Sequence, residues 1–128
     1  MAGTPEQRAA DLQAFIDDPE IRAIICARGG YGSVQLLEHV NFFKLIENPT
    51  WIVGYSDITV LHNKLSAMSF ESLHATMPIN FKQNTKESLE SLRKALFNEE
   101  LSISCQKHSF NRKGTAEGRL TGGNLSMV

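Results

Sequence analysis

The sequence has few cysteines, no excess of either charge and no long apolar run. Cys26 and Cys105 form neither a CxxC pair nor a zinc-ligand spacing, so we expect two reduced thiols and no metal site. Lys plus Arg number 13 and Asp plus Glu 14, which leaves no basic excess for binding nucleic acid. The longest apolar runs are strand-length, short of the roughly 20 residues of a membrane span. The polar start MAGTPEQR also lacks the apolar core of a secretory signal peptide, so we expect a cytoplasmic protein that does not contact a membrane.

The 128 residues, 41% of them hydrophobic, suffice for one domain with a single core. A capping box of Thr4 and Gln7, with Pro5 between them, predicts a helix over 4–16. The isoleucine-rich run IRAIICA at 21–27 is typical of a strand buried on both faces. This run is followed by the glycine-rich turn RGGYG at 28–32.

The rest of the chain alternates in the same way. The patterns predict a helix at 33–40, a buried strand at 50–56, a helix at 57–68, and a short strand within 72–81 with a loop at Pro78. They then predict a helix near 85–97 capped by Asn84 and Glu87, a strand at 101–105 and a polar loop at 107–118. Such alternation predicts an α/β fold with an open, mostly parallel sheet and helices on both faces, in three α/β/α layers.

Both glycine-bearing turns follow predicted strands, and chemistry in open parallel sheets collects at those carboxyl ends. In RGGYG, Gly30 and Gly32 fit part of a dinucleotide fingerprint, but Gln35 occupies the third glycine position. The turn could therefore cradle a phosphate, serve only as a tight turn, or present backbone N–H groups to a developing oxyanion.

The second turn, GYSD at 54–57, also has two interpretations. Ser56 and Asp57 are favoured helix N-caps, so a strand-to-helix turn carrying them requires no function. Alternatively, the turn is a nucleophile elbow that raises the Ser56 hydroxyl above the sheet, although the usual second glycine is replaced by Ile58.

A serine nucleophile needs a base, and none of the four histidines is a convincing one. His39 and His62 fall late in predicted helices, where we expect surface or packing roles away from the strand ends. His108 lies in the polar loop, and only His74 could approach the crevice. We therefore expect that the chain does not contain a complete Ser-His-carboxylate triad.

Four segments, ARGGYGS, GYSDIT, LHATMPINF and GRLTGGNL, resemble in this order the serine LD-carboxypeptidases, or muramoyltetrapeptide carboxypeptidases. That family includes the microcin-immunity hydrolases, and the likeness covers nearly the whole chain. The resemblance implies that Ser56 is the nucleophile and that the amides of Asp57 and Gly30 form the oxyanion hole. It also implies that a glutamate and a histidine from a second, C-terminal domain complete the triad.

The resemblance further implies release of the terminal D-alanine from murein tetrapeptides during cell-wall recycling, in the cytoplasm and without a cofactor. Arg28 is a candidate for binding a substrate carboxylate, with a structural salt bridge as the alternative. Gly29, Tyr31 and Tyr55 are further candidates for lining the cleft, although packing against helices explains the tyrosines as well.

The sequence departs from the family pattern in its HATMP segment at 74–78, where many relatives have His-Gly-Pro. We expect 1–118 to be a truncated N-terminal nucleophile domain and 119–128 the start of a linker to a domain outside this chain. The fragment alone should then be inactive, and the full-length protein is a candidate homodimer. A microcin-immunity type of hydrolase and a non-catalytic anion-binding module remain the alternatives.

Overall fold

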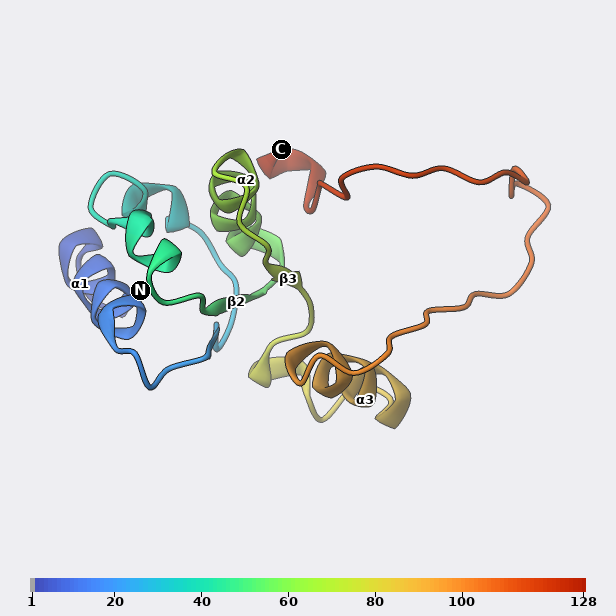
Figure 1. Cartoon of the computed structure of the whole chain (residues 1–128), viewed down its shortest axis with the longest axis horizontal. Coiled ribbons are helices and arrows are strands. Elements are labelled where there is room, and N and C mark those ends of the chain that lie inside the picture. The colour runs from blue at the N-terminus through green and yellow to red at the C-terminus, as the bar shows by residue number, and fades with distance from the viewer. Residues whose placement is uncertain (1) are drawn as a thin grey trace.

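The computed structural model describes residues 2–128 and contains an open sheet of three parallel strands (Figure 1). The strands are β1 (Ala23–Ile25), β2 (Trp51–Gly54) and β3 (Leu73–His74), in the order β1-β2-β3. Ile24 pairs with Ile52, and Val53 pairs with Leu73. The predicted α/β class with a parallel sheet is confirmed.

Within residues 2–128, three α-helices and five 3₁₀ helices precede, connect and follow these strands. They are α1 (Pro5–Asp17), η1 (Ser33–Leu36), η2 (Phe42–Ile46), η3 (Ser56–Ile58), α2 (Thr59–Ala67), η4 (Pro78–Asn80), α3 (Lys86–Leu96) and η5 (Leu125–Met127). Helix α1 begins as its sequence predicts, because the Thr4 hydroxyl accepts a hydrogen bond from the Gln7 amide and the Gln7 side chain accepts one from the Thr4 amide.

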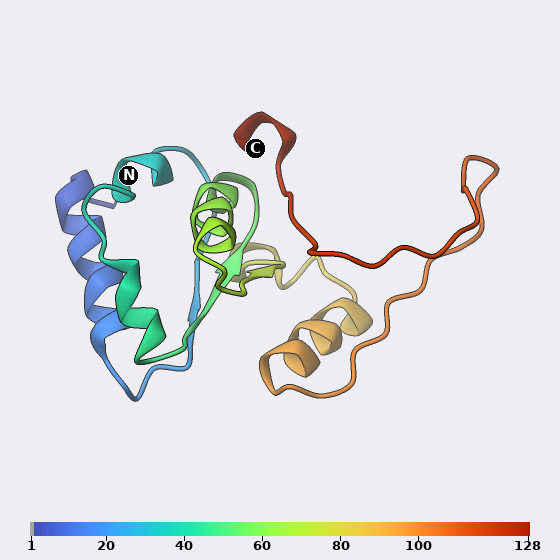
Figure 2. The same ribbon diagram turned by 45° about the horizontal axis from the view of Figure 1, so that its top comes forward.

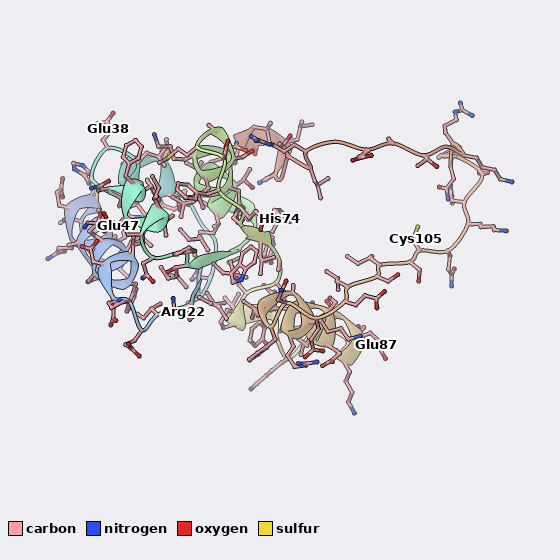
Figure 3. The ribbon with its side chains drawn as sticks, in the orientation of Figure 1. Arg22, Glu38, Glu47, His74, Glu87 and Cys105 are labelled. Carbon is pink, nitrogen blue, oxygen red and sulfur yellow. The ribbon has the colours of Figure 1, made fainter. Side chains whose placement is uncertain are left out.

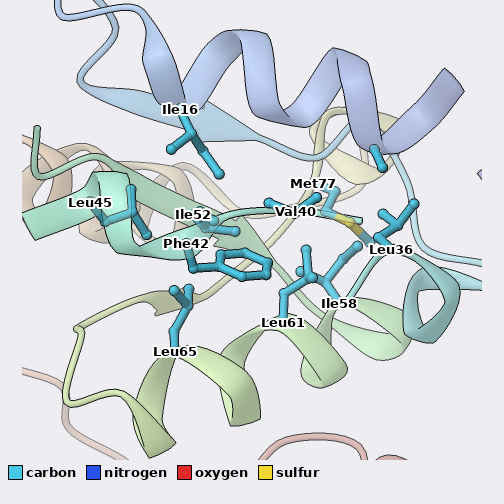
Figure 4. Close-up of a cluster of buried hydrophobic side chains, with 11 residues drawn as sticks. Ile16, Leu36, Val40, Phe42, Leu45, Ile52, Ile58, Leu61, Leu65 and Met77 are labelled. Carbon is cyan, nitrogen blue, oxygen red and sulfur yellow. The ribbon is translucent and has the colours of Figure 1, made fainter. Parts of the chain in front are cut away.

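The hydrophobic core joins the N-terminal helix, the first crossover, the central strand and α2 (Figure 4). Ile16 of α1 and Ile52 of β2 are fully buried, and Phe42 of η2 is nearly so. Leu61 and Leu65 lie one turn apart on α2 and bring that helix against the same cluster. This packing fixes where α2 begins, and therefore where the residues between β2 and α2 must lie.

Two predictions about the first crossover are wrong. Strand β1 is not buried on both faces, because its three residues are only partly buried or exposed and Ile25 is 38% exposed. Residues 33–40 do not form one α-helix; bonds such as Leu37 N to Val34 O, at 3.2 Å, span three residues. Leu36 at the end of η1 and Val40 beyond it are nevertheless both buried in the core.

The region after β3 also departs from the prediction. Helix α3 is capped by Thr85, whose hydroxyl accepts from the Ser88 amide, whereas the Asn84 side chain lies against Thr76. Residues 101–105 are exposed and unpaired, so the predicted strand does not form within the described chain. The residues LSISC alternate between apolar and polar as a strand does, but no strand lies beside them to pair with. Cys105 is exposed on this extended segment (Figure 3).

The chain returns from that extended segment and ends beside α2 (Figures 1 and 2). The Asn124 amide donates to the Thr59 hydroxyl at 3.0 Å, and the Asn63 side chain donates to the Met127 carbonyl at 2.9 Å. Among residues 2–128, none of the helices has the length and apolarity needed to cross a membrane.

Candidate active site

The carboxyl ends of the three strands meet at one edge of the sheet, joined by backbone hydrogen bonds. The Ala75 amide donates to the Gly54 carbonyl at 3.1 Å, just beyond β2 and β3. The Ile79 amide then donates to the Ala27 carbonyl at 3.2 Å, which brings the segment after β3 back to the end of β1. The two glycine turns therefore share one edge of the sheet, as expected for parallel strands.

Ser56 occupies a strained turn at the end of β2. Its φ is 61°, in the left-handed region that residues other than glycine rarely adopt. Gly54 makes the turn possible, because a Cβ there would lie 2.9 Å from Cγ1 of Ile58. The side chain of Ile58 thus needs the space that only glycine leaves, and the chain bends sharply into α2.

The RGGYG loop packs directly against this serine. A Cβ on Gly29 would lie 3.1 Å from Cβ and 3.4 Å from Oγ of Ser56. Gly30 and Gly32 have φ values of 157° and 92°, so the loop uses glycine's access to positive φ, as the sequence predicts. The amide of Gly30 belongs to the peptide bond that follows Gly29, so it lies one peptide unit from the contact with Ser56.

An open pocket of about 520 Å³ lies beside the two turns. Its lining includes Arg28, Gly29, Gly30, Tyr31 and Asp57, five of the seven residues singled out from the sequence. Ala2, Arg8 and Ser33 line it too, and sequence reasoning gave none of them a role. Nothing in the local pattern marked them, because the fold alone brings α1 and the start of η1 to this edge.

Arginines supply the positive charge around the pocket. Arg28 is exposed and makes no ion pair within residues 2–128; its Nε donates to the Gly29 carbonyl at 3.3 Å. The structural salt bridge considered for Arg28 is therefore not formed in the described chain. Arg8 is held against the loop, with Nη1 3.5 Å from the Gly32 carbonyl and Nη2 3.1 Å from Oε1 of Gln35.

The two tyrosines differ in their surroundings. Tyr31 lines the pocket and is 74% exposed. Tyr55 is partly buried against the core, and its hydroxyl donates to Oδ1 of Asn80 at 2.7 Å. Its ring meets His74 edge-on, with the ring centroids 6.4 Å apart. Packing therefore accounts for Tyr55, which is absent from the pocket lining.

The carboxylate of Asp57 is buried between the two turns. Its Oδ2 accepts a hydrogen bond from the Ser33 amide at 3.0 Å and another from the Ser33 hydroxyl at 2.6 Å. Both residues are 6% exposed. Sequence reasoning considered Asp57 as a helix N-cap or as an oxyanion-hole amide. Neither η3 nor α2 has a side-chain cap hydrogen bond, and the contact of the Asp57 carboxylate with Ser33 was missed.

His62 is a packing residue, as predicted. The prediction that it lies away from the strand ends is wrong, because its ring contacts the end of β2. Its Nε2 lies 2.9 Å from the Gly54 carbonyl, and its Nδ1 lies 2.8 Å from the Ser72 hydroxyl. Burial lowers the pKa of His62 below its ordinary value of 6.5, and the nearby His74 lowers it further. The neutral ring then donates from Nε2 to the carbonyl and accepts from Ser72 at Nδ1.

Within residues 2–128, the Ser56 hydroxyl makes no hydrogen bond, so neither His62 nor His74 is placed as its base. The same residues contain no cluster of side chains arranged to hold a metal ion. The arrangement places Ser56 in a strained turn against the Gly29 loop. A serine hydroxyl and backbone amides able to stabilise an oxyanion are two parts of a machinery for acyl transfer.

Residues 1–75 match the family described as the LD-carboxypeptidase N-terminal domain. The chain belongs to this family. Over its whole length it is 34% identical to the murein tetrapeptide carboxypeptidase of Pseudomonas aeruginosa, of which the alignment covers 45%. The resemblance inferred from the glycine turns is therefore confirmed.

Solved structures of LD-carboxypeptidase relatives share the fold. The muramoyltetrapeptide carboxypeptidase of Oxalobacter formigenes superposes with a TM-score of 0.68 at 25% identity, over 75% of this chain and 35% of that one. The microcin C7 self-immunity protein MccF, solved with aspartyl sulfamoyl adenosine, gives 0.66 at 27% identity, over 73% and 30%. The chain spans less than half the length of the curated relatives that it matches from end to end.

Proposed function

We propose that this chain is the nucleophile-bearing part of a serine LD-carboxypeptidase that releases the terminal D-alanine from murein tetrapeptides in the cytoplasm. The observation that carries the proposal is the contact of the Gly29 loop with Ser56, which itself lies in a left-handed turn. Family membership gives this geometry its reaction class. We further propose 1–118 as the partial nucleophile domain, 119–128 as the start of the linker, and a homodimer for the longer protein.

In the proposed mechanism the Ser56 oxygen attacks the carbonyl carbon of the bond before D-alanine. The carbonyl oxygen becomes an alkoxide, which accepts hydrogen bonds from the amides of Gly30 and Asp57. A histidine oriented by a glutamate, both outside these 128 residues, takes the serine proton and passes it to the departing amine as the carbon–nitrogen bond breaks, which leaves the peptide acylated on Ser56. The same histidine then takes a proton from a water molecule, which hydrolyses the ester and restores the serine. Arg28, exposed and unpaired by any acid in the described chain, is the proposed partner of the substrate carboxylate.

The proposal is tested by measuring D-alanine release from a murein tetrapeptide. A protein that joins this chain to the family's C-terminal half should release D-alanine, and Ser56→Ala should lower the rate by about 10⁴-fold or more. The isolated 128-residue chain should release none, because it lacks the base. Serine-dependent release by the isolated chain would show that the base lies within it and would overturn this division of the triad.

Two other functions compete. Similarity to MccF favours a microcin-immunity type of hydrolase with a nucleotide-peptide substrate. The arginine-bearing pocket would also suit a non-catalytic module that binds anions. A fluorophosphonate probe applied to the longer protein separates the classes, since labelling at Ser56 requires an activated serine. Anion binding with an unlabelled Ser56 would instead support the module.

A further inference from the structure

The Asp57 carboxylate is committed to a single partner residue. One of its oxygens, Oδ2, accepts both the amide and the hydroxyl hydrogen of Ser33, 24 residues earlier in the chain. Burial of a carboxylate is unfavourable unless hydrogen bonds compensate it, and bonds to an ionised acceptor are stronger than neutral ones. This doubly bonded contact is therefore a strong and specific link between two distant segments.

The two residues of this link belong to the two segments that carry the proposed oxyanion-hole amides, those of Gly30 and Asp57. Ser33 directly follows Gly32, the last residue of the RGGYG loop, and Asp57 directly follows Ser56. A hydrogen-bonded pair at these positions fixes the end of the loop relative to the turn that carries the nucleophile.

The loop needs such a restraint. Gly30 has open space around it, since a Cβ there would meet no atom within 4 Å. Glycine also gives the loop wide conformational freedom. The hydrogen bond that α1 makes to the loop, from Nη1 of Arg8 to the Gly32 carbonyl, is long at 3.5 Å. Two hydrogen-bonded contacts thus join this end of the loop to segments distant in the sequence, one from Arg8 and one from Asp57. The contact with Asp57 is the shorter and the more deeply buried.

We propose that the Asp57 side chain is a positioning group that holds the RGGYG loop at the Ser56 turn and so sets the spacing of the Gly30 and Asp57 amides. This inference rests on the proposed function for its catalytic consequence. It assigns to the carboxylate a role distinct from that of the Asp57 amide, which every substitution except proline retains.

Because the amide survives substitution, Asp57→Ala isolates the carboxylate. Asp57→Asn keeps an oxygen that can accept both bonds but loses the charge, so it is the conservative variant. Ser33→Ala removes the hydroxyl bond and keeps the amide bond, which makes it a milder break from the other side. Asp11→Ala, which removes an exposed acid from α1 with the same change in charge, is the matched control.

The first measurement is amide hydrogen exchange of peptides covering 28–34 in the purified 128-residue chain, which needs no activity. Exchange should be faster in Asp57→Ala by about tenfold or more, faster by a smaller factor in Ser33→Ala and Asp57→Asn, and unchanged in Asp11→Ala. Far-ultraviolet circular dichroism identifies variants that have failed to fold. If Asp57→Ala does not fold, Ser33→Ala and Asp57→Asn test whether the link restrains the loop. Exchange at the wild-type rate in both of these variants overturns the proposal.

The second measurement is steady-state D-alanine release by the longer protein. Asp57→Ala should lower kcat by about 10²-fold, the scale of losing one oxyanion donor, with KM within about twofold, and Asp57→Asn should recover most of the loss. A kcat within twofold of wild type in Asp57→Ala would overturn the positioning role. If the wild-type protein releases no D-alanine, the proposed function fails, while the exchange data still decide whether the link holds the loop.

Discussion

At the residue scale, the buried side chains of Asp57 and His62, on either side of Ser56 in the structure, are both hydrogen-bonded. Asp57 bonds Ser33, and His62 bonds the carbonyl of Gly54, two residues before the serine. The Gly54 carbonyl thus accepts from both His62 and Ala75. Such contacts restrain the strained turn from both sides, which a left-handed serine requires if it is to persist.

His62 gives the fold a dependence on pH. Its pKa is lowered in the folded protein, so its contribution to stability is complete above 6.5 and is lost as pH falls through the folded-state pKa. We expect the free energy of unfolding, measured with urea, to fall between pH 7 and pH 5.

The matched variant is His62→Gln, whose side-chain amide can still donate to the Gly54 carbonyl but does not titrate. Its free energy of unfolding should change less over the same pH interval. Carboxylates with lowered pKa values, such as Glu90 beside Arg93, lose their contribution only as pH falls from about 4.5, which separates the two effects. An equal pH dependence in wild type and variant would contradict the assignment to His62.

At the element scale, the path of the chain from β2 into α2 depends on one small residue. Gly54 is buried at the end of the strand, and the Ile58 side chain occupies the space where a Cβ would stand. Ile58 is itself 6% exposed and β-branched, so it has little room to move. The strand, the turn and the helix are therefore fitted to one another as a unit.

Gly54→Ala should accordingly destabilise the protein. The added methyl group would lie 2.9 to 3.1 Å from three atoms of Ile58, and overpacking of this kind costs about 1–3 kcal/mol. Gly114→Ala is the control, because a Cβ at Gly114 meets nothing within 4 Å and should change stability by less than about 0.5 kcal/mol. Urea unfolding curves compare the two, and equal midpoints would contradict the packing argument.

At the scale of the whole molecule, the core-forming part and the segment after α3 differ in burial and in regular structure. Most residues of 99–118 are exposed and lie outside regular structure, whereas Arg119 returns to α2 by donating to the Ser66 carbonyl at 3.0 Å. Exposed backbone without paired neighbours is the preferred target of proteases.

Limited trypsin digestion of the isolated chain should therefore cut first at Lys107, Arg112 or Lys113. Lys64, within α2, and Arg119, hydrogen-bonded to that helix, should be cut later and serve as internal controls. Mass spectrometry of early time points reads out the order. Initial cleavage inside α2 would show that the helix is less stable than its packing implies.

The sequence was sufficient to predict those elements whose signals are local. The capping box of α1 and the isoleucine-rich or apolar strands are read from neighbouring residues, and the glycines indicated the positive φ values of the loop. It failed where the outcome depends on distant partners: LSISC alternates like a strand but finds none to pair with. In the site, Gly29 and Ser56 were recognisable, whereas Ser33 was not, because its link to Asp57 exists only after the fold brings the two segments together.

The attachment of the C-terminal segment to α2 has a mechanical consequence. A Cβ at Gly123 would lie 2.6 Å from the Thr59 side chain, and the Asn124 amide bonds the same hydroxyl. Thr59 opens α2, three positions beyond Ser56. Tension applied at the C-terminus would therefore be transmitted through the Asn124–Thr59 hydrogen bond to the first turn of α2. It would reach the backbone of the serine turn before it disturbed the rest of the sheet.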